Sequence, residues 1–198
     1  MNVRVKRGGN KVPWNKGKQP GQKLPLSLKE VRTIRRRLKS DRQMRQLVLF
    51  SLAIESNLSA CDLVRLRVRD VGKEGRVASQ ATLRRLQTNR PVQFAISDET
   101  RIAIAAWIAR ENLKPADYLF PSRIHESPHL STRQYARIVA SWVNMIGLDP
   151  NAYGTESLRR TSPMLLYRTT RNVEAVQGLL GHVKRATTAR YLGITDEA

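Results

Sequence analysis

The 198-residue sequence is poor in cysteine, in aromatic residues and in acidic residues, and it has no long apolar run. A single cysteine, Cys61, excludes an architecture held together by disulfide bonds within the chain. Aromatic residues make up 6% of the chain, and no RNA-recognition motif with stacked aromatic residues is present. No apolar run reaches the roughly 18 residues of a membrane span, and the basic N-terminus lacks the apolar core of a signal peptide. We therefore predict a cytoplasmic protein that does not span a membrane.

Positive charge is what the sequence has in excess. Lysine and arginine number 36 against 16 aspartate and glutamate residues, so the formal net charge is +20. Charge of this size favours a polyanionic partner, with nucleic acid as the first choice and an anionic membrane as the second. Solvated surface lysines are the plainer interpretation, but arginine dominates and recurs beside apolar helical positions.

The composition divides the chain into a basic tail, residues 1–25, and a single domain, residues 26–198. The tail holds seven lysines and arginines and no acid, and glycine and proline interrupt any regular element. Two interpretations of the tail stay open. It either lies along the phosphates of a nucleic acid or forms a disordered leader.

The domain is predicted to be mainly α-helical with a small antiparallel β-hairpin sheet. Ser27 and Glu30 form a capping box at the start of the first helix. Alternating apolar residues predict strands at 75–82 and 90–96, with a turn at 86–89. Helices are predicted over residues 27–39, 41–56, 98–112 and 131–147, with another from Ser59 and two or three more within 156–193.

Three short motifs in the last third of the chain carry a family resemblance. Residues 153–161 read YGTESLRRT, residues 179–182 read LLGH, and residues 190–193 read RYLG. Tyr191 follows His182 by nine residues. The pattern resembles the tyrosine recombinase (phage integrase) family, whose signature is His-x-x-Arg, then Leu-Gly-His, then a tyrosine nine residues later.

Two upstream segments extend the resemblance. Residues 63–70, LVRLRVRD, are similar to the first conserved box of the family, and residues 88–92, TNRPV, are similar to its β-hairpin. The resemblance therefore covers roughly residues 27–193 and implies a fold like the catalytic domain of a tyrosine recombinase.

The resemblance also implies a chemistry. In the family, a tyrosine hydroxyl attacks a DNA phosphodiester and forms a covalent phosphotyrosine. Two arginines and one or two histidine or tryptophan donors meet the charge of the transition state, and a hairpin lysine protonates the leaving 5′ oxygen. No metal or other cofactor is required, and the sequence shows no metal-ligand cluster. Arg159, His182 and Tyr191 match the family's catalytic positions.

Three other catalytic positions are substituted. Ser59 stands at the place of the first-box arginine, Gln87 at that of the hairpin lysine, and Glu156 at that of the first histidine. Each has a local structural interpretation: a helix N-cap, a neutral turn residue and a favourable charge in a first helical turn. Losing one oxyanion donor typically costs about 10²–10³ in rate. The hairpin holds three arginines that are candidates to replace the missing cation, Arg84, Arg85 and Arg90.

These residues predict a DNA-binding protein of this family, associated with DNA recombination or integration. We expect weak or no strand cleavage and a regulatory or accessory role, because two donors and the general acid are absent. The alternative is an active site-specific recombinase that cleaves DNA through a 3′-phosphotyrosine at Tyr191, so enzymatic activity stays open. A third hypothesis is a basic protein that binds RNA or another anionic partner without recombining DNA.

The expected partner is double-stranded DNA. Contacts with it are predicted for Arg159, Arg90, Arg65 and Arg67, although the last two suit surface charges on a helix equally well. An active recombinase paralogue and further copies of this chain on DNA are candidate protein partners, whereas no membrane partner is expected. A bacterial cytoplasm or nucleoid is the expected location.

Overall fold

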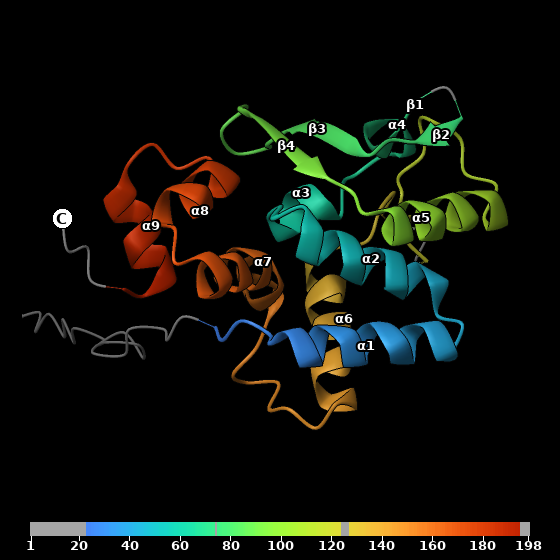
Figure 1. Ribbon diagram of the computed structural model, residues 1–198. Coiled ribbons are helices and arrows are strands. Elements are labelled where there is room, and N and C mark those ends of the chain that lie inside the picture. Colours follow the sequence, from blue (N-terminus) through green and yellow to red (C-terminus); the bar gives the residue numbers. More distant parts are fainter. Residues whose placement is uncertain (1–22, 74, 124–126, 195–198) are drawn as a thin grey trace, which may run out of the picture.

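The computed structural model describes residues 23–73, 75–123 and 127–194, so most of the predicted tail lies outside the described residues. Within these ranges the chain forms nine helices and two small antiparallel sheets (Figure 1). The predicted fold class, mainly α with a small hairpin sheet, is confirmed. Among the described helices, none combines the length and apolar character that crossing a bilayer requires.

The predicted helices and strands occur in the expected order with shifted bounds, and the structure adds a short helix and a short strand before residue 75 that were not predicted. The helices are α1 (Leu28–Ser40), α2 (Met44–Glu55), α3 (Ala60–Leu63), α4 (Val68–Val71), α5 (Asp98–Arg110), α6 (Thr132–Met145), α7 (Thr155–Thr170), α8 (Val173–Leu180) and α9 (Arg185–Leu192). The strands are β1 (Gly72–Lys73), β2 (Arg76–Val77), β3 (Gln80–Arg84) and β4 (Pro91–Ala95).

Serine caps set where three helices begin. The predicted capping box of α1 is confirmed, since the Ser27 hydroxyl accepts from the Glu30 N–H and the Glu30 carboxylate accepts from the Ser27 N–H. Ser97 and Ser131 cap α5 and α6 in the same way, each accepting from a backbone N–H three residues later.

The prediction of a single strand over residues 75–82 is wrong. It divides into β2, which pairs with β1, and β3, which pairs with β4. The chain changes partner between Ala78, whose N–H bonds to the Val71 carbonyl, and Ser79, whose carbonyl accepts from the Ile96 N–H. Alternation in the sequence could not reveal this change, because both strands keep the same period.

The helix predicted from Ser59 is shorter than its apolar pattern indicates. Helix α3 ends at Leu63, and the chain is extended before α4 begins at Val68. The Leu66 carbonyl accepts from the Leu119 N–H at 2.7 Å, and Arg67 forms a β-bridge with Tyr118. Pairing with this distant segment ends the helix, although the helical spacing of apolar residues continues.

Two separate hydrophobic clusters hold the molecule together. The larger one lies between α1, α2, α5 and α6 and extends to the hairpin and the start of α7. The smaller one joins α8 and α9 through Val176, Leu180 and Leu192, with Tyr167 and Tyr191 packed against it. Helix α7 connects the two clusters, since it packs against both α2 and α8 (Figure 1).

Trp142 on α6 is the largest fully buried side chain of the main cluster. Its ring meets Phe50 edge-on at 5.2 Å between centroids, and its indole N–H donates to the Gln46 side chain at 2.6 Å. We expect Trp142→Ala to lower the free energy of unfolding by about 3–5 kcal/mol, because it leaves a large cavity. Urea denaturation followed by circular dichroism measures this loss. A loss below about 1 kcal/mol would contradict the burial described, and Trp142→Phe should cost less than Trp142→Ala.

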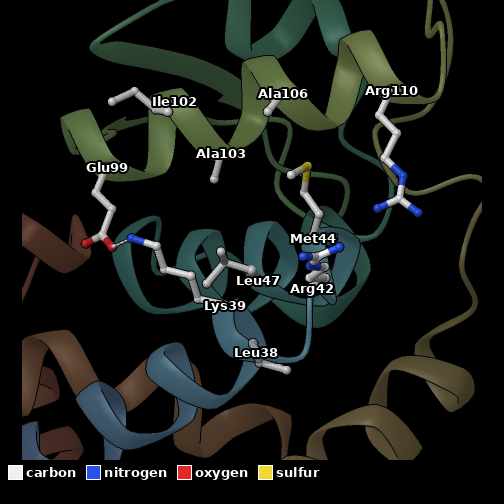
Figure 2. A pocket seen from close by; sticks show the side chains of 10 residues that line it. All are labelled: Leu38, Lys39, Arg42, Met44, Leu47, Glu99, Ile102, Ala103, Ala106 and Arg110. Carbon is white, nitrogen blue, oxygen red and sulfur yellow. Dashed lines mark ion pairs between the residues drawn. The ribbon is translucent and has the colours of Figure 1, made fainter.

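An apolar groove of about 410 Å³ lies where the end of α1 and the start of α2 meet α5. Leu38, Leu47 and Met44 line the groove together with alanines of α5, and Figure 2 shows Met44 pointing toward α5 and the Lys39–Glu99 ion pair, 3.9 Å, at one end. In Figure 1 this region lies on the side of the molecule away from α8 and α9. None of the residues that line the groove belongs to α7, α8 or α9.

Candidate functional site

Arg159 lies in the second turn of α7 and is fixed by a main-chain contact. Its Nε donates to the carbonyl of Asn57 at 3.1 Å, a buried residue with a left-handed φ of 52°. One terminal nitrogen lies 3.9 Å from the Glu156 carboxylate, one turn earlier on the same helix. Pro163 further along α7 lacks the N–H that would bond to the Arg159 carbonyl. The guanidinium is thus oriented by the segment before α3, while 27% of the side chain stays exposed.

His182 lies in the turn between α8 and α9. Gly181 ends α8 in the left-handed conformation, with φ of 67°, and the His182 N–H bonds to the Gln177 carbonyl. The imidazole Nδ1 is 3.1 Å from the Thr188 hydroxyl. Burial lowers the pKa of His182, and the positive charges of Arg159 and Arg85 lower it further. Both effects favour the neutral form of the ring.

Tyr191 lies on α9 beside this histidine. The two rings meet edge-on at 5.8 Å between centroids and 77°. Among the described residues, the buried Tyr191 hydroxyl has no hydrogen-bond partner. Burial raises the pKa of Tyr191, and the negative charge of Glu156 raises it further, while Arg159 and Arg160 act in the opposite direction. At neutral pH the phenol keeps its proton.

Arg160 attaches α9 to α7. Its guanidinium donates to the Tyr191 carbonyl at 2.9 Å and lies 5.3 Å from the centre of the Tyr191 ring. The side chain is 5% exposed, so this contact is made inside the protein. The structure thus brings together the three predicted positions, Arg159, His182 and Tyr191, with Arg160 beneath the tyrosine.

The local interpretation of Ser59 agrees with the structure. Its hydroxyl accepts from the Asp62 N–H at 3.3 Å and lies 2.7 Å from the Asp62 carboxylate. The other oxygen of that buried carboxylate accepts from the Leu86 N–H at 2.9 Å. The residues at the start of α3 therefore also fix Leu86, at the beginning of the turn between β3 and β4.

The other two substituted positions lie where their local interpretations place them. Glu156 lies in the first turn of α7, where its negative charge suits the helix N-terminus. It also lies close enough to influence both Arg159 and Tyr191. Gln87 is exposed in the turn that joins β3 to β4.

The remaining predicted DNA contacts lie on the hairpin side. Arg65 and Arg90 are exposed. Arg67 is held by Tyr118, since its guanidinium carbon lies 4.1 Å from the ring centre and one nitrogen donates to the phenol oxygen. Arg65, Arg67 and Arg84 line a groove of about 210 Å³ that also holds Asp62 and Asp70.

Three residues of the site were missed by sequence reasoning. Thr188 precedes Tyr191 by three residues, so helical spacing puts both on one face of α9. The sequence gives no reason to separate Arg160 from its neighbour Arg159, because only the burial of the Arg160 side chain distinguishes the two arginines. Asn57 acts through its main-chain carbonyl and leaves no signal in the sequence.

In the described ranges, no three histidine, cysteine, aspartate or glutamate side chains lie close enough to hold a metal ion. His129 contacts the Leu130 carbonyl through Nδ1 and packs against Tyr118, while His125 lies outside the described residues. The polar groups that the site offers to a ligand are the guanidinium of Arg159, the imidazole of His182 and the hydroxyl of Tyr191, a set suited to an oxyanion.

A helical body with an arginine, a histidine and a tyrosine at the junction of α7, α8 and α9 defines the catalytic-domain class of fold found in tyrosine recombinases. Residues 25–198 match the phage integrase family. The chain belongs to this family.

Individual relatives agree with this assignment. The Bacillus subtilis (strain 168) protein named "Probable integrase/recombinase YoeC" is 27% identical over 171 residues, which cover 86% of this chain and 89% of the relative. The tyrosine recombinase XerD of Agrobacterium fabrum (strain C58) is 25% identical over 169 residues, 78% of this chain and 50% of the relative.

Solved structures share the fold at low sequence identity. The XerA recombinase superposes with a TM-score of 0.70 at 20% identity, over 87% of this chain and 61% of that one. The XerH site-specific recombinase bound to its difH substrate gives a TM-score of 0.68 at 18% identity, over 88% of this chain and 52% of that one. This chain therefore spans about half to three fifths of the length of XerD, XerH and XerA.

Proposed function

We propose that this protein binds duplex DNA and holds one backbone phosphate between Arg159, His182 and Tyr191, with weak or no strand cleavage and a regulatory or accessory role in recombination. The observation that carries the proposal is the buried Tyr191 hydroxyl beside His182, within reach of the charge of Arg159. A buried hydroxyl without a protein partner suits a site that a ligand oxygen completes.

Charge and kinship support DNA as the partner. A net charge of +20 favours a polyanion and predicts steep salt dependence of binding. The Tn1549 transposon integrase was solved in complex with circular intermediate DNA, and the present chain shares its fold. Duplex DNA is therefore the partner most consistent with both the family and the charge.

The cleavage step would begin at the Tyr191 oxygen. That oxygen would attack phosphorus, the bond from phosphorus to the 5′ oxygen would break, and the 3′ phosphate would remain on the tyrosine. The phenol proton would pass to water during the attack, and the departing 5′ oxygen would take one proton from water, so no net proton is gained or lost. Gln87, at the place of the family's lysine, has an amide that cannot serve as a general acid, and an arginine is a poor one because its pKa lies above 12.

Glu156 is the second reason to propose weak cleavage. Its negative charge raises the pKa of Tyr191 and therefore opposes formation of the attacking phenolate. At ~4 Å, two like charges repel by about 4 kcal/mol at an effective dielectric constant of 20, so a carboxylate here also disfavours a bound phosphate. Glu156 also forms an ion pair with Arg159, so its carboxylate competes with a bound phosphate for that guanidinium.

An active site-specific recombinase is the second candidate function. The contact between His182 and Tyr191 and the proximity of Arg159 favour it, because these are the groups that attack and stabilise the transition state in the family. The difference between the candidates is quantitative: how much covalent product forms.

A pool of nicked duplexes of randomised sequence tests the proposal. Each nick lets a short cleaved fragment diffuse away, which traps any covalent intermediate. We expect band shifts that weaken steeply with salt, duplex DNA preferred over RNA of equal length, and only a trace of adduct that survives SDS. Stoichiometric adduct would favour the active recombinase, and equal affinity for RNA would favour a general polyanion binder.

A further inference from the structure

We propose that Arg85 supplies the second phosphate-binding guanidinium of this site, in place of the arginine that the family carries where this chain has Ser59. This inference rests on the proposed function, since it assigns a further ligand of the same phosphate. The missing cation would then be supplied from the hairpin instead of from the start of α3.

The position of Arg85 brings its side chain across to the site. It directly follows β3, and its main chain is fixed by two hydrogen bonds, from its N–H to the Arg90 carbonyl and from the Asn89 N–H to its own carbonyl. Its guanidinium reaches the Leu180 carbonyl at 3.4 Å, two residues before His182. Figure 1 shows the turn between β3 and β4 projecting toward α8.

The positive charges around Arg85 favour the binding of an anion. Burial lowers the pKa of Arg85, the positive charge of Arg159 lowers it further, and Asp62 acts in the opposite direction. The same two arginines lower the pKa of His182. Arg85 and Arg159 therefore lie near each other and near the imidazole. Two guanidinium groups that repel each other in this way are a suitable clamp for a phosphate, whose charge would offset the repulsion.

The substituted first-box position itself contributes to placing Arg85. Ser59 contacts the buried Asp62 carboxylate, which accepts from the N–H of Leu86, the residue after Arg85. The start of α3 therefore holds the hairpin at the point from which Arg85 reaches α8. Replacing the first-box arginine by serine and supplying an arginine from the hairpin are parts of one arrangement.

The other two hairpin arginines lack this geometry. Arg84 is exposed, donates to the Asn89 carbonyl at 3.2 Å and lines the groove that Arg65 and Arg67 share. Arg90 is exposed, and its carbonyl pairs with the Arg85 N–H. Replacing Arg84 is therefore a suitable control, because it removes the same charge from the neighbouring residue.

Titration of the His182 ring by NMR provides a readout at the site itself. The full-length protein and its Arg85→Gln, Arg85→Lys and Arg84→Gln variants are titrated with pH and then with inorganic phosphate. We expect Arg85→Gln to raise the pKa of His182 and to weaken phosphate binding at this ring by about tenfold or more. Arg84→Gln should leave both unchanged, and Arg85→Lys should restore the pKa of His182.

Duplex DNA binding completes the test. Arg85→Gln should flatten the dependence of log K on log salt by about one unit, as expected for one lost phosphate contact. If Arg85→Gln matches the wild type in His182 pKa, phosphate affinity and salt slope, the assignment of Arg85 is wrong. If the wild type fails to bind duplex DNA while its His182 responds to phosphate and to Arg85, the anion site stands and the proposed function fails.

The lysine variant also controls for folding. Arg85→Lys keeps a positive charge at the same position but loses the planar fork that binds two phosphate oxygens. A variant with a restored His182 pKa and weak phosphate binding supports a direct contact by the guanidinium. If Arg85→Lys binds phosphate as weakly as Arg85→Gln and also shows the same raised His182 pKa, both effects follow from disturbed packing of the turn against α8 and the proposal is overturned.

Discussion

Tyr191→Phe is expected to abolish every protein–DNA adduct that survives SDS, however small the wild-type yield. The change removes a single oxygen, the atom proposed to attack phosphorus, and keeps the ring that packs against His182 and Arg160. Stability should be retained or slightly raised, because the wild-type hydroxyl is buried without a partner among the described residues. Denaturing gels of labelled nicked DNA measure the adduct, and thermal unfolding measures the stability.

Tyr167→Phe is the matched control for this experiment. Tyr167 packs against the same small cluster from α7, with Arg171 over its ring, but it lies outside the set formed by His182 and Tyr191. Adduct formation should survive this change. An adduct that persists in Tyr191→Phe would mean that another residue attacks the phosphate and that the site is assigned wrongly.

Arg159→Ala should have the next largest effect. Loss of one oriented donor to the transition-state charge typically lowers the rate by about 10²–10³, so the residual cleavage should fall by that factor. Binding to duplex DNA should also weaken, with a salt slope flatter by about one unit. The variant removes the cation that Glu156 faces, which leaves an uncompensated negative charge beside the phosphate.

Arg168→Ala separates this local effect from a general loss of charge. Arg168 is an exposed residue on the same helix, so its replacement changes the net charge equally. A slope that flattens as much in Arg168→Ala as in Arg159→Ala would show that both act as distant charges. Arg159→Lys should recover part of the binding and little of the cleavage, because an ammonium group cannot replace the two-pronged guanidinium.

Local signals in the sequence were sufficient for much of the fold and for the centre of the site. Ser27 and Glu30 predict the start of α1 because a capping hydroxyl acts within four residues of its own position. The spacing of Arg159, His182 and Tyr191 identified side chains that the structure brings together, because a family resemblance carries information about contacts far apart in the chain.

Features that depend on distant partners could not be predicted. The division of residues 75–82 between two sheets depends on hydrogen bonds to Val71 and Ile96, and the early end of α3 depends on a segment more than fifty residues later. Arg85 was one of three equivalent hairpin arginines in the sequence. Its distinction comes from the Leu180 carbonyl and from the charge of Arg159, which only the folded chain places nearby.

The division of the hydrophobic interior into two clusters affects the order in which parts of the site lose their structure. His182 and Tyr191 belong to the small body of α8 and α9, whereas Arg159 is fixed to the segment before α3 on the large one. A body with so few buried side chains is the part expected to open at the lowest free energy. Such an opening would move Tyr191, the proposed nucleophile, away together with His182 and leave Arg159 in place. Catalytic competence would then be lost well before the protein unfolds.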